Sequence, residues 1–219
     1  MWEIFLAGGP VMWPLLICSL LVCSVVLERA WFWRHFNQES DREIIEKLLE
    51  DFRTNGPDWQ PTPPSPAPVP GAVLRMLLSG IAHRHFSMAR AMEAEALDEV
   101  QRMQRGMGIL DTMITAAPML GILGTVIGII TSFELLAQAG AGEPQAVIGG
   151  IAQALISTAA GLIISLCALL PFNYFNSRIE SAQDLLESWA SRLEMLQAGL
   201  NGGAGSLPGA GKDISGQLG

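Results

Sequence analysis

The stretch MLGILGTVIGIITSF, residues 119–133, contains no charged residue and is hydrophobic enough to lie in a lipid bilayer. It also holds three glycines, Gly121, Gly124 and Gly128, around one threonine, Thr125. Each glycine lowers the stability of a helix by about 1 kcal/mol relative to alanine, so helix propensity does not explain three of them. The pattern predicts a membrane helix whose glycines allow close helix packing, and it raises the question of what Thr125 faces.

The composition of the whole chain is typical of a membrane protein. Half of its 219 residues are hydrophobic, and only 16% are charged. Three runs with few or no charges are long enough for a membrane helix, which needs roughly 20 apolar residues; they cover residues 11–33, 112–137 and 147–177. We therefore expect an all-α membrane protein with three transmembrane helices, of which the second and third are long and extend into the cytoplasm as a helical bundle.

The distribution of positive charge predicts the orientation of these spans. No Lys or Arg precedes Arg29, so the first span is expected to be an uncleaved anchor and not a signal peptide. The turn between the second and third spans also lacks positive charge, and the positive-inside rule then places the N-terminus outside and the C-terminus inside. The expected regions are an extracytoplasmic N-terminus over residues 1–10, a cytoplasmic helical loop over residues 34–111, and an extracytoplasmic turn over residues 138–146.

Within the cytoplasmic loop, Ile45, Leu48, Leu49 and Phe52 share one helical face and predict a short amphipathic helix. Seven prolines in residues 57–70 exclude a helix there and predict a semi-extended linker. From residue 72 to about residue 105 the helical periodicity returns and continues into the second span. The periodicity predicts that the second span is the upper part of one long helix.

Beyond the third span, residues 178–198 are expected to form a cytoplasmic helix. It carries a heptad-like seam of apolar residues: Ile179, Ala182, Leu186, Trp189, Leu193 and Leu196. The seam fits packing against the loop helices of the same chain and a subunit interface equally well. Residues 199–219 are rich in glycine and predict a disordered tail.

Polar residues inside the second and third spans are the candidate functional residues. Counted from the ends of their spans, Thr125 and Thr158 come to a similar depth on adjacent antiparallel helices. Each is followed seven residues later by another hydroxyl, Ser132 or Ser165, on the same helical face. A threonine can instead bond to a carbonyl of its own helix. The matched pairs favour a polar stripe on the two helices.

Small residues in the same spans are candidates for helix packing: Gly121, Gly124, Gly128, Ala154 and Gly161. Gln153 is a further polar residue that needs a hydrogen bond in the membrane, and it is a candidate pore or interface residue. The three cysteines lie inside spans without metal-ligand spacing, and no nucleophile or catalytic base stands out. We expect no enzyme activity, no metal, no cofactor and no nucleic-acid partner.

Two segments resemble a known family. LDTMITAAPMLGILGTVIGIITSF (residues 110–133) and GGIAQALISTAAGLIISLCALLPFNYF (residues 149–175) resemble the second-span and third-span signatures of the MotA/TolQ/ExbB proton channel family. The first 33 residues are similar to ExbB-type N-termini. The three-span topology with an external N-terminus fits ExbB and TolQ better than four-span MotA.

The resemblance implies a subunit of a proton-driven complex in the bacterial inner membrane. It implies a homo-oligomer, a pentamer, whose second and third spans surround the single-span helices of an ExbD- or TolR-like partner that supplies an aspartate. Thr125 and Thr158 match the pore threonines of the family, which implies that their stripe with Ser132 and Ser165 lines the proton pathway. Gln153 stands where relatives commonly carry Glu. The expected output is ExbB-like support of TonB-dependent import, with a TonB-like protein as a further partner. A TolQ-like role in envelope maintenance and a non-conducting scaffold are the alternatives.

Overall fold

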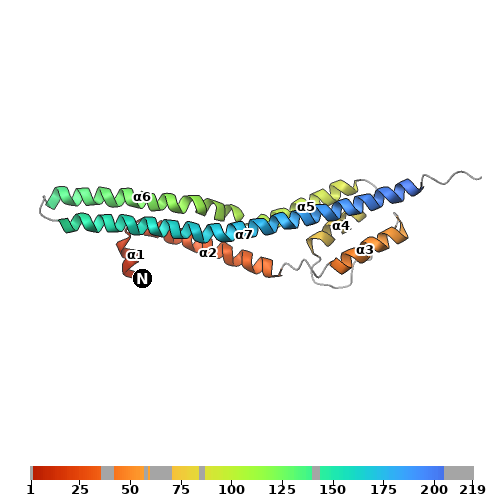
Figure 1. Ribbon diagram of the computed structural model, residues 1–219, viewed down its shortest axis with the longest axis horizontal. Coiled ribbons are helices and arrows are strands. Elements are labelled where there is room, and N and C mark those ends of the chain that lie inside the picture. The colour runs from red at the N-terminus through yellow and green to blue at the C-terminus, as the bar shows by residue number, and fades with distance from the viewer. Residues whose placement is uncertain are drawn as a thin grey trace, which may run out of the picture. The chain divides into compact units, whose positions relative to one another are not determined.

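Every described element of the chain is an α-helix. In the computed structural model the described residues are 2–35, 42–56, 59, 71–83, 87–139 and 144–204. The helices are α1 (Trp2–Ala7), α2 (Met12–His35), α3 (Arg42–Asn55), α4 (Ala72–Ala82), α5 (Met88–Gln104), α6 (Met107–Ala139) and α7 (Pro144–Ala204) (Figure 1). The predicted all-α fold is confirmed for these residues. The predicted linker over residues 57–70, apart from Trp59, lies outside the described residues.

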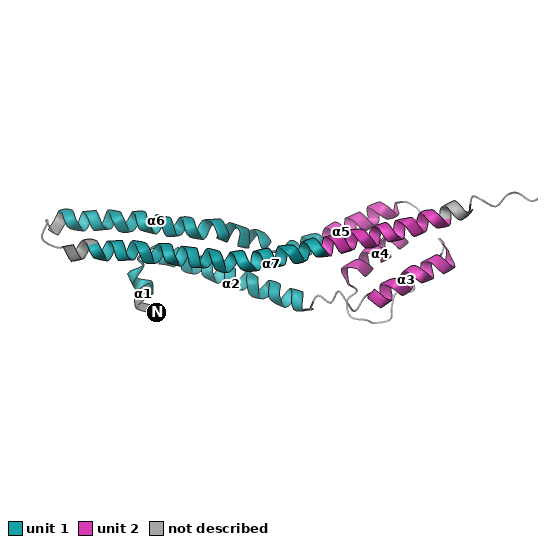
Figure 2. Cartoon of the chain, viewed as in Figure 1, with its two compact units in different colours: residues 1–36, 100–181 teal, residues 37–99, 182–219 magenta. Residues whose placement is uncertain are grey.

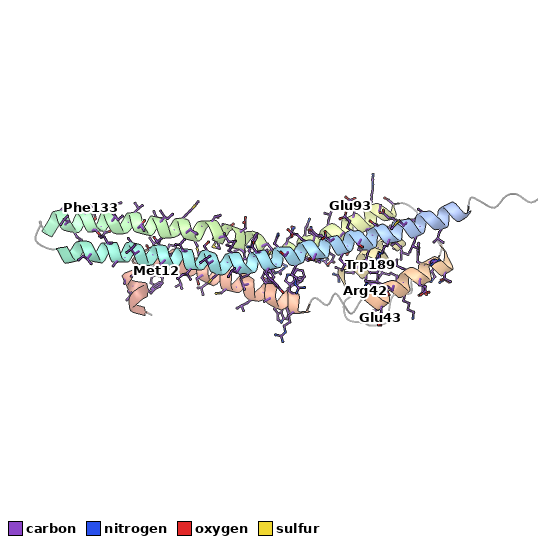
Figure 3. The ribbon with its side chains drawn as sticks, in the orientation of Figure 1. Met12, Arg42, Glu43, Glu93, Phe133 and Trp189 are labelled. Atoms are coloured by element: carbon purple, nitrogen blue, oxygen red, sulfur yellow. The ribbon has the colours of Figure 1, made fainter. Side chains whose placement is uncertain are left out.

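Three of the helices are long and apolar enough to cross a membrane, within Met12–Arg34, Met107–Ala137 and Ile148–Leu200. At 1.5 Å per residue, the 33 residues of α6 extend about 50 Å and the 61 residues of α7 about 90 Å. A bilayer core is about 30 Å thick, so both helices continue beyond it. Phe133, near the loop end of α6, is 64% exposed and suits contact with lipid or another membrane helix (Figure 3). The chain is a multi-pass membrane protein with a long second and third span, as predicted.

The helices form two compact units, unit 1 with residues 1–36 and 100–181 and unit 2 with residues 37–99 and 182–219 (Figure 2). In unit 1, α2 runs antiparallel to α6, because Val11 lies beside Gly124 and Val25 lies beside Gly106. Val11, which directly precedes α2, and Leu15 of α2 are buried together with Ala117 of α6. The first span therefore packs along the N-terminal half of α6, between Gly106 and Gly124.

The second span does not continue the preceding helix. The prediction of one uninterrupted helix was wrong, because α5 ends at Gln104 and α6 begins at Met107. Between them Gly106 has a φ of 80°, a left-handed conformation that glycine adopts readily and that commonly ends a helix. The region expected to be helical from residue 72 is also interrupted after α4, which ends at Ala82. Local backbone conformation thus overrides the continuous apolar periodicity.

The helix of the third span ends later than expected. α7 continues to Ala204, so residues 199–204 are helical and do not belong to the predicted tail. A glycine in a helix lowers its stability by only about 1 kcal/mol, so an established helix can pass through several of them. Residues 205–219 of the tail lie outside the described residues.

Arg29, near the C-terminal end of α2, connects this helix to the end of α5. Its side chain is almost fully buried, and Nη1 donates to the carbonyls of Arg102 at 3.1 Å and Met103 at 3.2 Å. The last four carbonyls of a helix lack partners within the helix, and a cation there also interacts favourably with the helix dipole. The guanidinium additionally pairs with Glu28 at 3.0 Å and lies over the ring of Phe32. Arg29 therefore caps α5 at the point where the chain turns into the second span.

Unit 2 is built like a water-soluble helical bundle. The amphipathic helix predicted around residue 45 is confirmed as α3, with Ile45, Leu48 and Phe52 buried. The α7 seam is also buried, with Ala182, Leu186, Trp189 and Leu193 at 5% exposure or less. Trp189 and the start of α3 are labelled in Figure 3. Because these side chains are buried within a single chain, packing against helices of the same chain is favoured over a subunit interface.

A buried ion pair joins α4 to α5 in unit 2. Arg75 Nε donates to Glu99 Oε1 at 2.8 Å, and Nη2 donates to Oε2 at 2.7 Å. The Glu99 side chain is 3% exposed and the Arg75 side chain 24%. This two-point geometry gives the pair a defined orientation as well as charge compensation.

Replacing Arg29 should destabilise unit 1 more than replacing a neighbouring arginine. Arg29→Met keeps a long side chain but leaves the Arg102 and Met103 carbonyls without a donor, so we expect the free energy of unfolding to fall by about 2 to 3 kcal/mol. Unfolding of the detergent-solubilised protein, followed by circular dichroism, measures this change. Arg34→Met is the matched control, because Arg34 is exposed on the same helix. Equal effects of the two substitutions would contradict the capping role.

The Arg75–Glu99 pair predicts a similar contrast in unit 2. Glu99→Gln removes the charge that compensates Arg75, and we expect a loss of about 3 kcal/mol, near the lower end for buried pairs because Arg75 keeps some solvent access. Asp98→Asn changes an exposed neighbour in the same way and should have little effect. Chemical unfolding curves of the two variants, recorded side by side, measure the difference.

Candidate functional site

The predicted site residues lie on the α6–α7 hairpin, whose two helices run side by side in opposite directions (Figure 1). Glycines bring the two backbones together. A Cβ built on Gly161 would lie 2.5 Å from the carbonyl oxygen of Ala117, and one built on Gly128 would lie 2.8 Å from that of Gly150. A Cβ on Gly121 would lie 3.1 Å from Thr158 Cα. No side chain fits at these positions without displacement, so close approach explains these glycines.

Gly124 has a different neighbourhood. A Cβ at this position would meet the Ser157 side chain and would lie 3.6 Å from Val11 Cβ. Gly124 therefore lies where α6 meets both α7 and the start of α2. Ala154, the remaining predicted packing residue, is 4% exposed and lies against Gly128. All five predicted packing residues thus lie at helix contacts within unit 1.

Each of the four predicted hydroxyls donates a hydrogen bond to a backbone carbonyl. Two bonds cross between the helices, from Thr158 to the Gly121 carbonyl at 3.0 Å and from Ser165 to the Ile114 carbonyl at 2.7 Å. The other two stay within α6. Ser132 donates to Gly128 at 2.8 Å, and Thr125 donates to Ile122 at 2.6 Å.

The two threonines are offset along the backbone, but their hydroxyls lie close in depth. Thr158 Cα lies beside Gly121, four residues before Thr125. The hydroxyls of Thr158 and Thr125 nevertheless donate to the consecutive carbonyls of Gly121 and Ile122, which are about 1.5 Å apart along α6. Helical side chains lean toward the N-terminus of their helix, which brings the Thr125 hydroxyl back toward the level of Thr158.

Thr125 makes a hydrogen bond within its own helix, which is the alternative to a hydroxyl that faces a pore. Its side chain is partly exposed, and its hydroxyl donates to its own helix. A hydroxyl has one donor and two acceptor lone pairs, so the Thr125 oxygen still accepts hydrogen bonds. Ser132, by contrast, is 3% exposed and lies against Gly150 of α7. A pore-lining role for these residues stays a prediction.

Gln153 lies against the turn between α1 and α2. Gly9, which has a φ of 75°, has no room for a side chain, because a Cβ there would fall 2.6 Å from Gln153 Cδ. One turn further along α7, Ile156 lies beside Gly8 of the same turn. The structure thus places Gln153 at the N-terminal turn, at an interface within the chain.

Sequence reasoning missed two residues of the hairpin. Ser157 is fully buried against Gly124 and donates to the Ala154 carbonyl at 2.8 Å. Gly150 is the contact of Gly128 and Ser132. Small residues recur at positions 150, 154, 157 and 161, three or four residues apart, and this periodicity was the available signal.

Acidic and basic side chains are absent from the middle of the hairpin. Residues 112–133 of α6 and residues 144–177 of α7 contain no Asp, Glu, Lys, Arg or His. In the described part of the chain, no group of three or more His, Cys, Asp or Glu side chains is arranged to hold a metal ion. The middle of the hairpin therefore offers hydroxyls and carbonyls, and no carboxylate, amine, guanidinium or imidazole.

The close contact at Gly161 predicts sensitivity to a single methyl group. Gly161→Ala should lower the free energy of unfolding by about 1 to 3 kcal/mol, because the added Cβ overlaps the Ala117 carbonyl. Gly149→Ala is the matched control on the same helix, since a Cβ there meets nothing within 4 Å. It should be neutral or stabilise the helix by up to about 1 kcal/mol. Thermal unfolding in detergent compares the two, and a neutral Gly161→Ala would contradict the packing.

Comparison with known proteins agrees with this architecture. A sequence profile of the MotA/TolQ/ExbB proton channel family matches residues 71–188. The chain is 36% identical over 201 residues to ExbB-like 1, a biopolymer transport protein of Synechocystis, and the match covers 88% of this chain and 77% of that protein.

Shorter matches include proteins named for two different systems. Over 93 residues, 42% of this chain, identity is 37% both to the biopolymer transport protein ExbB of Xanthomonas campestris and to the Tol-Pal system protein TolQ of Pseudomonas aeruginosa. These matches cover 36% and 40% of those proteins, respectively. Matches to the profile and to the Synechocystis protein each extend over more than half of the chain, which therefore belongs to the MotA/TolQ/ExbB proton channel family.

Proposed function

We propose that this chain is the channel subunit of a complex in the bacterial inner membrane that uses the proton motive force to drive an envelope process. The observation that carries the proposal is the α6–α7 hairpin, where oxygen atoms lie in an uncharged segment long enough to cross the bilayer. Proton conduction through a membrane protein normally needs a group that titrates. The uncharged segments of the hairpin, residues 112–133 and 144–177, contain no carboxylate, so a partner supplies one.

The proposed partner is a single-span protein of the ExbD or TolR type with an aspartate in its membrane helix. The hydrogen bonds of the hairpin define what such a carboxyl group would meet. Thr125 and Thr158 both use their hydroxyl protons on carbonyls, so each offers an acceptor oxygen. A protonated carboxyl donates to such an oxygen, whereas a carboxylate needs a donor and competes for the hydroxyl proton. The threonines would thereby distinguish the two protonation states of the partner.

The proposed assembly is a homo-oligomer, a pentamer, around the partner helices, with the N-terminus periplasmic and the C-terminus cytoplasmic. Absence of positive charge before Arg29 and in the α6–α7 turn supports this orientation. Apolar side chains such as Ile122 and Leu162 are more than half exposed in the single chain and support burial against lipid or other subunits.

Within the family, an ExbB-like role that supports TonB-dependent import is the first candidate output. It is favoured by the match to the Synechocystis ExbB-like 1 protein, which covers 88% of this chain. A TolQ-like role in envelope maintenance is the second candidate, favoured by the equal identity of the shorter ExbB and TolQ matches. The two outputs differ in the partner that acts across the envelope.

The hydroxyl of Thr125 provides the test of the channel role. Thr125→Val preserves shape and removes the acceptor oxygen, so we expect proton-driven activity to fall at least about tenfold, in the range typical of losing one group that assists proton transfer. Thr125→Ser should retain activity. The measurement is proton uptake into vesicles that contain the chain together with its single-span partner.

Thr131→Val is the matched control for this experiment. Thr131 lies on the same helix, is also partly buried and donates to its own helix at 3.0 Å, but it is not part of the predicted stripe. Copurification of the single-span partner with every variant verifies assembly. Equal activity of Thr125→Val and the wild type would favour a non-conducting scaffold, as would recovery of a stable complex that has no partner bearing an intramembrane aspartate.

A further inference from the structure

A proline interrupts the hydrogen-bond ladder of α6 in the middle of its membrane segment. Pro118 lies inside this helix and has no backbone N–H. In an α-helix the N–H of residue 118 would donate to the carbonyl of residue 114. The Ile114 carbonyl therefore lacks its usual donor, and in the membrane core no water replaces it.

The carbonyl that Pro118 leaves without its usual donor accepts a bond from another helix. Ser165 Oγ of α7 donates to Ile114 O at 2.7 Å, and the two residues are 51 positions apart in the sequence. Both the serine side chain and the bond are partly buried. The hydroxyl of Ser165 thus donates to the Ile114 carbonyl in place of the N–H that Pro118 lacks.

The neighbouring interhelical bond differs in kind. Thr158 also donates to an α6 carbonyl, that of Gly121. The usual donor to that carbonyl is the N–H of Thr125, four residues later, and threonine has this group. The Thr158 bond is therefore additional to the backbone hydrogen bonds of α6, whereas the Ser165 bond replaces a backbone hydrogen bond that Pro118 removes.

We propose that Ser165 is a positioning residue that closes the proline break in α6 and holds the helix beyond Pro118, including Thr125, in register on α7. The assignment gives Ser165 a backbone partner within the chain in place of the pore-lining role expected from the sequence. Its effect on proton conduction rests on the proposed function, but the hydrogen bond itself does not.

Solid-state NMR of the full chain in lipid bilayers tests the bond directly. Labelling with carbonyl-¹³C isoleucine and ¹⁵N threonine selects two peptide bonds, Ile114–Thr115 and Ile130–Thr131, because isoleucine precedes threonine only at these two places. Ser165→Ala should shift the Ile114 carbonyl signal upfield, since that oxygen loses its donor. The Ile130 signal is the internal reference and should stay in place, and Ser165→Thr should restore the Ile114 signal. An Ile114 signal unchanged by Ser165→Ala would overturn the proposal.

A double-mutant cycle tests whether the serine acts through the proline break. Pro118→Ala restores an N–H at position 118, so the Ile114 carbonyl no longer depends on Ser165. We expect Ser165→Ala to lower the ratio of folded to unfolded protein roughly tenfold in the wild-type background and much less in the Pro118→Ala background. Equal losses in the two backgrounds would overturn the proposal.

Proton uptake with the partner then separates this proposal from the proposed function. If Ser165 positions Thr125, Ser165→Ala should lower uptake, and both Ser165→Thr and the double variant Ser165→Ala with Pro118→Ala should restore it. Wild-type uptake in Ser165→Ala would overturn the positioning role. Failure of the channel function would instead appear as absence of uptake in the wild type, with the NMR and stability results unaffected.

Discussion

Backbone hydrogen bonding in an environment without water is the constraint on which unit 1 depends. A carbonyl or amide in the bilayer core must find its partner inside the protein. Where the helical ladder is complete, the structure needs only apolar side chains. Where Pro118 breaks the ladder, the side chain of Ser165, from a distant part of the sequence, completes it. Arg29 plays a related part at the end of α5, where it donates to two carbonyls of the last turn.

The same constraint explains why small residues dominate the α6–α7 contact. In lipid there is no hydrophobic force that brings two apolar helices together, so close backbone packing and interhelical hydrogen bonds must provide the attraction. Gly121, Gly128 and Gly161 permit the approach, and the approach brings the Thr158 hydroxyl within reach of a carbonyl on the other helix. Packing and hydrogen bonding in this hairpin therefore depend on each other.

Unit 2 follows the rules of a protein in water. Its helices bury one apolar face each, its core is made of large side chains such as Phe52, Leu77 and Leu193, and its buried charge is compensated by a two-point ion pair. α7 contributes residues to both units. A single helix thus changes from small residues spaced for close packing to a heptad-like seam of large residues, according to the solvent around it.

Much of this architecture was readable from the sequence alone. The three spans, the amphipathic α3, the buried α7 seam and the packing glycines follow from periodicity and composition, because those properties record which surface each helix buries. The end of α5 before Gly106 did not follow, because a left-handed glycine can end a helix within a continuous apolar periodicity. The bonds from Thr158 to Gly121 and from Ser165 to Ile114 did not follow either. Both of these bonds depend on which residues of separate helices lie opposite one another. Periodicity identifies the face of a helix, but only the tertiary structure sets its register against a neighbour, because that register comes from contacts between residues far apart in the chain.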